Sequence, residues 1–397
     1  MDSLRIGMVA PPWYPIPPHG YGGIELVVSL LVDGLRQAGH TVVCFGAEGS
    51  GPGVRPLAAA EWEADLGGPA EGWRSANYAA RLQAALAAER PFDLIHDHSG
   101  GAGLLVAAAA GRGPVLHTVH GSLDEPAHTF YQGLAARVGL IAISPSQRAS
   151  APELPWFATV PNAVDVDQLR LPDGRPPEPY LLCLARICPE KGQHLAIAVA
   201  RRTGRPLVLA GKVEATASSR AYFEREIRPH LDGVRVRHVA NVAGPEKADL
   251  LARASVLLAP VQWPEPFGLS AAEAMTSGTP VVALRQGAMV DLVEPGRTGY
   301  LCDSVDEMVV AVAAAVDLDR DDCARVARQR FSPDRMVEAA VQTYRDRLAV
   351  SRWAAEPLAQ VGPSVPQALG GLAPGLGPSA LAPATLPGLV PAPPIPW

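Results

Sequence analysis

The stretch from Val256 to Leu284 reads VLLAPVQWPEPFGLSAAEAMTSGTPVVAL and contains a complete strand–helix–strand unit. Its two ends, Val256–Ala259 and Val281–Leu284, are short apolar runs, which are typical of strands buried on both faces of a parallel sheet. Between them, Ser270–Ser277 has the composition of a helix. The stretch therefore predicts a strand, a loop, a helix and a second strand parallel to the first.

The same alternation runs along most of the chain. Further strands are expected at Arg5–Ala10, Thr41–Phe45, Leu94–His96, Val115–Val119, Leu140–Ile143, Ala158–Val160, Tyr180–Leu184, Leu207–Ala210 and Val234–His238. Further helices are expected at Glu25–Ala38, Tyr78–Ala88, His194–Arg202, Ala221–Leu231 and Lys247–Ala254. Glu48–Trp73 has no clear period and is expected to be a loop with a short helix. Two series of parallel strands covered by helices predict an α/β fold with two doubly wound domains.

Breaks in this pattern predict the domain boundaries. Residues 171–179, LPDGRPPEP, hold five prolines or glycines in nine residues and are the expected linker. They separate a first domain at residues 1–170 from a second domain at residues 176–331. Residues 354–397 contain 11 prolines, 6 glycines and one charged side chain, so we expect a disordered, polyproline-like tail there.

Composition argues against several classes of protein. The formal net charge is −6 and there is no long basic run, which disfavours nucleic-acid binding. The five cysteines are scattered and form no CxxC pair, so neither a disulfide framework nor a zinc site is expected. No apolar run approaches the ~20 residues that span a bilayer, and the start lacks a cleavage-site pattern. We therefore expect a cytoplasmic protein.

The strongest chemical signal is the spacing of Glu265 and Glu273, two carboxylates separated by seven residues (an E-x7-E motif). Prolines on both sides of Glu265 keep it in the loop, whereas Glu273 is expected in the first helical turn. Carboxylates accept hydrogen bonds from vicinal hydroxyls, so a sugar and a ribose are natural partners. A structural alternative stays open, because Ser270 and Glu273 also fit a capping box.

Two other loops suggest an anionic ligand, because parallel sheets bind ligands at the carboxyl ends of their strands. Gly22 and Gly23 open a helix, where backbone amides attract anions, although a simple flexible turn is equally compatible. Arg186 and Lys191 follow a strand and suit a clamp on a diphosphate, the alternative being solvated surface charge. Only three of the 34 basic residues are lysines, Lys191, Lys212 and Lys247, so a lysine is an unusual choice in this chain.

In this order the motifs resemble those of the retaining glycosyltransferases of family 4, which have the GT-B fold. The resemblance covers Arg5–Leu348 and rests on YGGIE at 21–25, Asp93–His98, His117–Gly121, Val160–Asp165, the Arg186–Lys191 pair, Glu265–Glu273 and Glu294–Tyr300. It implies two Rossmann-like domains that face an interdomain cleft, with the last helix, within residues 332–350, returning to the first domain. It also implies transfer of a hexosyl group from a nucleotide-diphosphate sugar to a hydroxyl, with retention and without a metal ion.

The resemblance further implies roles for individual residues. Gly22 and Gly23 would approach the donor diphosphate, which Arg186 and Lys191 would neutralise. The donor sugar and ribose would be bound by the Glu265 carboxylate, the amides of Phe267, Gly268 and Leu269, and the Glu273 carboxylate. His120 would lie beside the transferred sugar. Asp97 and His98 would face the acceptor cleft, although a purely structural role for both stays open.

Two departures from the family pattern stand out. The family's Gly-Gly-x-x-Glu is replaced by GAMVD at residues 287–291, and its Asn-Gly turn by Asn162-Ala163. The alternatives to a transferase are a nucleotide-sugar epimerase or hydrolase of the same fold, or a non-catalytic sugar-nucleotide-binding protein. The expected partners are a nucleotide-sugar donor and an unidentified glycan, lipid or natural-product hydroxyl, with no cofactor and no nucleic acid. Peripheral membrane contact and a monomer or homodimer stay open.

Overall fold

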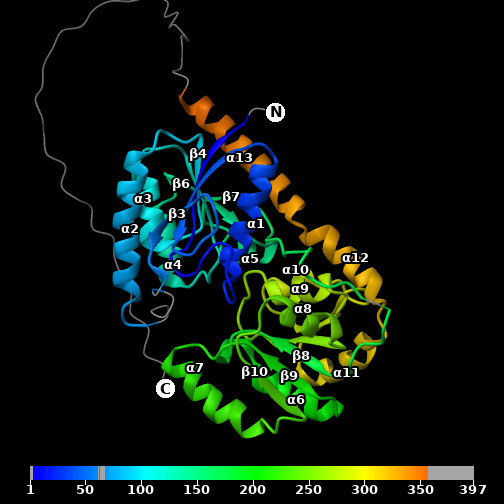
Figure 1. The fold of residues 1–397 in the computed structure, drawn as a ribbon. Coiled ribbons are helices and arrows are strands. Elements are labelled where there is room, and N and C mark those ends of the chain that lie inside the picture. Colours follow the sequence, from blue (N-terminus) through cyan, green and yellow to red (C-terminus); the bar gives the residue numbers. More distant parts are fainter. Residues whose placement is uncertain (1–2, 61, 63–67, 173, 356–397) are drawn as a thin grey trace, which may run out of the picture. The chain divides into compact units, whose positions relative to one another are not determined.

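A computed structural model describes residues 3–60, 62, 68–172 and 174–355 (Figure 1). The predicted disordered tail falls almost entirely on residues 356–397, which lie outside the described residues. Its first two residues, Ala354 and Ala355, instead end the last helix, α13 (Pro333–Ala355). The prediction of a disordered tail is therefore wrong for these two residues.

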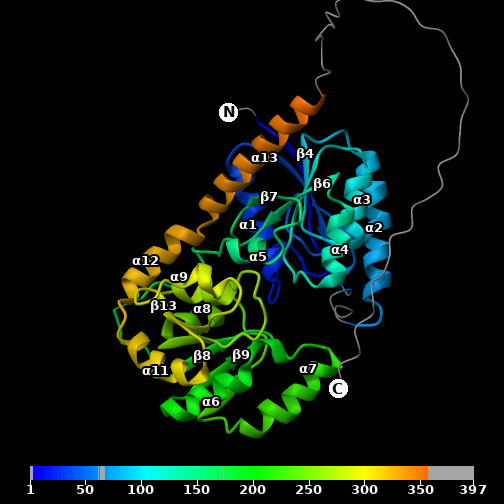
Figure 2. The same ribbon diagram turned by 180° about the vertical axis from the view of Figure 1, so that it is seen from behind.

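The first domain is built on a seven-stranded sheet with the order β3-β2-β1-β4-β5-β6-β7. All of its strand pairs are parallel. The strands are β1 (Arg5–Val9), β2 (Thr41–Ala47), β3 (Val54–Ala58), β4 (Leu94–Asp97), β5 (Val115–Thr118), β6 (Val138–Ala142) and β7 (Trp156–Thr159). Its helices are α1 (Gly23–Gln37), α2 (Glu71–Ala88), α3 (Gly101–Ala109), α4 (Glu125–Gly133) and α5 (Pro145–Ser150). One core joins the sheet to α1 and the other joins it to α2 and α3, so both faces are covered (Figures 1 and 2).

The second domain repeats this architecture on a six-stranded parallel sheet with the order β10-β9-β8-β11-β12-β13. The strands are β8 (Leu181–Leu184), β9 (Leu207–Ala210), β10 (Val236–Val239), β11 (Val256–Ala259), β12 (Val281–Leu284) and β13 (Gly299–Cys302). Its helices are α6 (Gln193–Thr203), α7 (Ala217–Tyr222), α8 (Gly244–Arg253), α9 (Leu269–Thr276), α10 (Met289–Leu292), α11 (Val305–Val316) and α12 (Arg320–Phe331). Side chains of α8, α9 and α12 pack on one face, and those of α6 and α11 on the other. The predicted fold of two doubly wound domains is confirmed.

Helix α13 belongs to the core of the first domain although it ends the described chain. Its buried side chains, which include Met336, Ala340 and Tyr344, pack with α1 against the first sheet. A side chain in place of Gly34 on α1 would collide with Val337, so the glycine permits the close approach of the two helices. The Tyr344 hydroxyl also lies 2.7 Å from Nδ1 of His96 on β4.

Several elements differ from the prediction. Strand β3 was not expected, because it is a short edge strand that contains a proline and has exposed positions. The helix expected at Ala221–Leu231 is divided into α7, a π-helical turn at Phe223–Ile227 and a 3-10 turn at Arg228–His230, where Pro229 cannot donate a helical hydrogen bond. Across the described residues, none of the helices has the length and apolar character needed to cross a membrane.

Candidate active site

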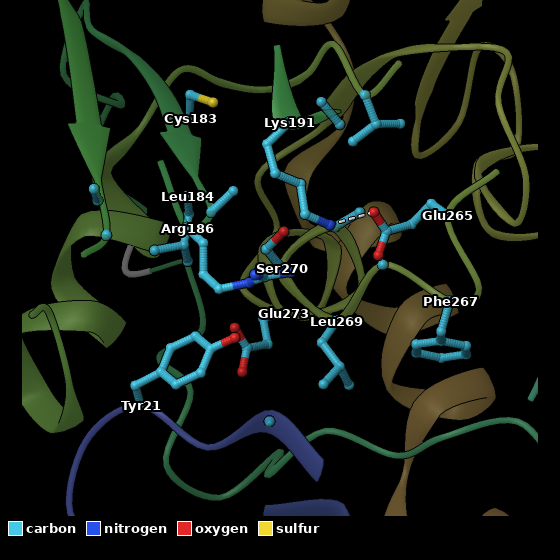
Figure 3. Close-up of a pocket in the computed structure, with 18 of the residues that line it drawn as sticks. Tyr21, Cys183, Leu184, Arg186, Lys191, Glu265, Phe267, Leu269, Ser270 and Glu273 are labelled. Atoms are coloured by element: carbon cyan, nitrogen blue, oxygen red, sulfur yellow. Dashed lines mark hydrogen bonds and ion pairs between the residues drawn. The ribbon is translucent and has the colours of Figure 1, made fainter. Parts of the chain in front are cut away.

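The carboxyl ends of strands from both sheets meet at one cavity of about 370 Å³. From the first domain it is lined by residues that include Gly22, Gly23 and His120. From the second domain its lining includes Arg186, Lys191, Lys212, Lys247, Glu265, Phe267, Gly268, Leu269 and Glu273 (Figure 3). Ligand sites of parallel sheets form at this edge. The structure therefore brings together the glycine pair, the Arg–Lys pair and both glutamates.

Two helix N-termini meet in this cavity. Helix α1 begins after Gly22, whose φ is 148°, and α9 begins after Gly268, whose φ is 94°. A Cβ atom placed on Gly23 would lie 2.8 Å from Cδ1 of Leu269, so the two helix starts are adjacent. The first turn of a helix offers amides without intrahelical partners and a partial positive charge. Two such ends side by side favour an anionic ligand.

The capping-box interpretation of Ser270 and Glu273 is wrong. The N-cap of α9 is Gly268, which makes no side-chain capping bond, and Ser270 lies inside the first turn. Glu273 consequently falls in the second turn of α9 and not in the first. Its Oε1 accepts a hydrogen bond from Lys247 Nζ at 2.7 Å, and the residue is 7% exposed. Glu273 is therefore directed at a cation beside the cavity and not at its own helix start.

Three pairs of a cation and a carboxylate line the cavity or flank it. Lys191 pairs with Glu265 at 2.5 Å (Figure 3). Trp263 Nε1 donates to the same carboxylate oxygen at 2.8 Å. Lys247 pairs with Glu273, and Arg186 pairs with Glu214. Arg186, Lys191, Glu265 and Glu273 are thus each held by an opposite charge, so positive groups are present without a large net charge. Glu214 and Trp263 were not predicted, because neither belongs to a recognisable spacing.

All three lysines of the chain line this cavity. Lys212, in the loop after β9, donates to the Tyr14 hydroxyl at 2.7 Å, and its Nζ lies 4.5 Å from the centre of the Tyr21 ring. Tyr14 and Tyr21 belong to the loop between β1 and α1, so Lys212 connects loops of the two domains. Sequence reasoning assigned a role only to Lys191. The scarcity of lysine was the signal that applied equally to Lys212 and Lys247.

The histidine of the first domain that reaches the cavity is His120, just beyond β5. Its Nε2 lies 2.9 Å from Nδ1 of His98, which follows β4 and is 5% exposed. Burial, reinforced by the neighbouring His117, lowers the pKa of His120 to about 3, and burial also holds the pKa of His98 well below its usual range. Both rings are therefore neutral at pH 7.

The two predicted acceptor-side residues lie behind the cavity. Asp97 is fully buried and accepts hydrogen bonds from Ser99 Oγ, the Gly100 amide and His117 Nδ1, at 2.6, 3.1 and 2.7 Å. His98 is covered by His120 on the cavity side. A direct contact with the acceptor stays a prediction for both, but their positions favour supporting roles. His117 is likewise held in the strand end by Asp97.

The loop at residues 287–291, where the chain departs from the family pattern, packs against the backbone of Glu265. Gly287 has a φ of 51°, and a side chain there would collide with the backbone of Glu265. The next amide, of Ala288, donates to the Glu265 carbonyl at 2.8 Å, so this loop supports Glu265 from behind. Asp291 accepts a hydrogen bond from the Ser146 amide of α5 at 2.9 Å and thereby links the two domains. Of the two glycines in the family pattern, this chain retains Gly287, where the close contact with the Glu265 backbone requires a glycine.

One group of described residues could be considered as a metal site. Single ligand atoms of Cys188, Glu190 and Glu214 lie within 4.8 Å of one another. Glu214 is already paired with Arg186, and burial raises the pKa of the Cys188 thiol to about 12, so the thiol stays protonated. A protonated thiol is a poor partner for Mg²⁺, which prefers oxygen ligands in octahedral geometry. This donor set does not fit the divalent ion that would accompany a diphosphate.

Two Rossmann-like domains with a shared cavity at their strand ends are the architecture of the GT-B fold. A family profile described as "Glycosyltransferase Family 4" matches residues 21–168, and one described as "Glycosyl transferases group 1" matches residues 169–330. The chain belongs to this family of glycosyltransferases, which transfer sugars from nucleotide-sugars.

Individual relatives agree with this assignment. A glycogen synthase of Mycobacterium tuberculosis is 30% identical over 392 residues, covering 83% of this chain and 91% of the relative. A phosphatidyl-myo-inositol mannosyltransferase of Mycolicibacterium smegmatis is 29% identical and covers 82% of this chain and 88% of the relative. Among solved structures, AviGT4, a glycosyltransferase involved in avilamycin A biosynthesis, is 28% identical with a TM-score of 0.66, covering 87% and 98% of the two chains. Sucrose-phosphate synthase from Thermosynechococcus elongatus shares the fold at 21% identity and a TM-score of 0.70, covering 87% and 100%.

Proposed function

We propose that this glycosyltransferase moves a hexosyl group from a nucleotide-diphosphate sugar to an acceptor hydroxyl, with retention of configuration and without a metal ion. The observation that carries the proposal is the set of three cation–carboxylate pairs at a cavity where two helix N-termini meet. This arrangement matches a ligand that carries a diphosphate next to two groups rich in hydroxyls.

The ion pairs suggest how the donor binds. A diphosphate entering the cavity takes over Arg186 and Lys191, because phosphate oxygens accept strong charge-assisted hydrogen bonds from both cations. The amides at Gly22, Gly23 and the start of α9 supply further donors. Once its cation turns to phosphate, Glu265 is free to accept hydrogen bonds from the hexose hydroxyls. Glu273 accepts in the same way from the ribose.

The chemistry follows from this placement. The bond between the anomeric carbon and the diphosphate oxygen breaks, and positive charge develops on the sugar ring. Stabilising the leaving diphosphate is the main electrostatic task, which Arg186, Lys191 and the helix amides perform. The acceptor oxygen attacks from the face that the diphosphate leaves, and its proton passes to a diphosphate oxygen. No side chain is required as the base.

The relatives support a hexose, because one of them is named a mannosyltransferase and another a glycogen synthase. Their names differ in the acceptor, so glycan, lipid and natural-product hydroxyls are all compatible with this chain. The five cysteines are all buried and unpaired, which fits a reducing compartment such as the cytoplasm.

A two-stage experiment tests the proposal. Thermal-shift measurements with UDP-, GDP-, ADP- and dTDP-sugars identify the donor, because a ligand that binds only the folded state raises the melting temperature. Nucleotide release is then measured with and without candidate acceptors, and the anomeric configuration of the product is read by NMR. We expect acceptor-dependent release and retention. Acceptor-independent release would indicate an epimerase or hydrolase, binding without turnover would indicate a binding protein, and an inverted product would refute the mechanism.

A further inference from the structure

The contact between His98 and His120 indicates which nitrogen of each ring carries the proton. Nδ1 of His98 and Nε2 of His120 are 2.9 Å apart, and the rings are stacked with centres 5.2 Å apart. Nε2 of His98 is buried and has no hydrogen-bond partner within the described part of the chain. His120 lines the cavity, and Nδ1 is the ring nitrogen that its contact with His98 does not use.

Only two proton arrangements satisfy this contact. Both rings are neutral, so each has one N–H donor and one bare nitrogen acceptor. In the first arrangement His120 donates from Nε2, and His98 then carries its own proton on Nε2. In the second arrangement His98 donates from Nδ1, and His120 then carries its proton on Nδ1.

The surroundings of His98 distinguish the two arrangements. The first places an N–H group at Nε2 of His98, where it is buried and has no acceptor. Orphaned buried N–H groups are rare in folded proteins and carry the full desolvation penalty of the donor. The second leaves a bare nitrogen at the same position, and unsatisfied acceptors are tolerated more often than unsatisfied donors. The second arrangement is therefore favoured.

We infer that His98 is a positioning residue that fixes His120 as its Nδ1–H tautomer, so that His120 offers the cavity a hydrogen-bond donor. The tautomer itself does not depend on the proposed function. Its consequence does: with a nucleotide-sugar bound, the N–H of His120 donates to an oxygen of the transferred sugar. The bare nitrogen of His120 is occupied by His98, so it cannot take the proton of the acceptor hydroxyl.

Nitrogen NMR tests the tautomer directly. The full-length protein is labelled with ¹⁵N-histidine, and the ring signals of His98 and His120 are assigned by their loss in His98→Gln and His120→Gln. The ¹⁵N shifts of protonated and bare ring nitrogens differ widely. We expect His120 to be protonated at Nδ1 and bare at Nε2 at pH 7. A proton on Nε2 of His120, or on both of its nitrogens, would overturn the inference whatever the enzyme transfers.

Kinetics test the consequence. His98→Leu removes the N–H group that donates to His120, whereas His98→Gln retains an amide N–H that can donate in the same direction. We expect kcat/KM for the nucleotide-sugar to fall about tenfold in His98→Leu and to recover largely in His98→Gln. Circular dichroism checks that both variants are folded. His128→Gln changes a histidine remote from the cavity and should have no effect.

Nucleotide-sugars that each lack one hydroxyl of the transferred sugar complete the test. The nucleotide-sugar that lacks the oxygen contacted by His120 should show the same kcat/KM in the wild type and in His98→Leu. An equal tenfold loss of kcat/KM with every nucleotide-sugar would show that His120 makes no such hydrogen bond to the sugar. The NMR result would then decide the tautomer alone. Absence of any nucleotide-sugar turnover would instead refute the proposed function and not the tautomer.

Discussion

Lys191 and Arg186 face the same cavity but are held by different carboxylates, Glu265 and Glu214. We predict that either Lys191→Ala or Arg186→Ala lowers kcat by at least about 100-fold. Removing one well-placed electrostatic group costs roughly 3 kcal/mol of transition-state stabilisation. Steady-state kinetics with the identified donor measure the effect. Arg202→Ala is the matched control, because Arg202 is an exposed arginine paired with Asp306. Near wild-type rates in both cavity variants would show that Arg186 and Lys191 do not bind the diphosphate.

The two glutamates should respond differently to the loss of charge. We predict that Glu273→Gln raises the donor KM by roughly tenfold, about 1.4 kcal/mol, because hydrogen bonds to a charged acceptor are stronger than those to a neutral one. Glu265→Gln should instead lower kcat, because its proposed partner is the sugar undergoing reaction. Donor titrations of both variants separate the effects. Unchanged kinetics in both would make the seven-residue spacing a coincidence.

At the level of residues, the sequence singled out side chains that line the cavity, but not all of the side chains that pair with them. The spacing of Glu265 and Glu273 and the rarity of lysine were visible in the chain. Glu214 could not be predicted, because it meets Arg186 only through the three-dimensional path of two loops. Trp263 lies two residues before Glu265 in the same loop, and its contact depends on how that loop turns. The capping-box alternative was compatible with the sequence and is excluded by one fact, the start of α9 at Leu269.

At the level of elements, the ends of β4 and β5 place three histidines together, the buried His96 and His98 and the half-buried His120. His96, His98 and His120 all have pKa values lowered chiefly by burial, to about 3 for His96 and His120. The unfolded chain therefore takes up protons below about pH 6.5 that the folded protein does not bind. Stability is complete above that pH and falls as the pH decreases towards 3.

We predict that the free energy of unfolding decreases by about 2 kcal/mol for each of these histidines between pH 7 and pH 5. Urea titrations at the two pH values measure this decrease. His96→Gln keeps groups that can bond to Tyr344 and Thr118 but does not titrate, so its decrease should be smaller by about one such contribution. An identical decrease in the variant and the wild type would contradict the assignment of His96 as a neutral, buried ring.

The accuracy of the element predictions follows from how strongly each strand is buried. β9, β11 and β12 were predicted to the residue, because their uninterrupted apolar runs pack under helices on both faces. β3 was missed, because it is an edge strand whose Arg55 and Pro56 are exposed. β13 was missed as well, since its four residues begin with a glycine and overlap a motif that was interpreted only for function.

At the level of the whole molecule, cations of the second domain and helix starts of both domains line one shared cavity. We predict that activity survives extensive treatment with EDTA, because side chains and backbone amides meet the charge of the diphosphate. Turnover is compared before and after chelation, and again after addition of Mg²⁺ or Mn²⁺. Loss of activity on chelation that either ion restores would show that the mechanism is wrong.

The central claim is that this cavity recognises a diphosphate through Arg186, Lys191 and the two helix starts. Calorimetry of a nucleoside diphosphate against the matching monophosphate measures that recognition alone, without an acceptor. We predict that the diphosphate binds at least about 100-fold more tightly to the wild type, about 2.7 kcal/mol, and that the double variant Arg186→Ala/Lys191→Ala loses most of this difference. Equal affinities for the two nucleotides, or a ratio that the double variant leaves unchanged, would contradict the account.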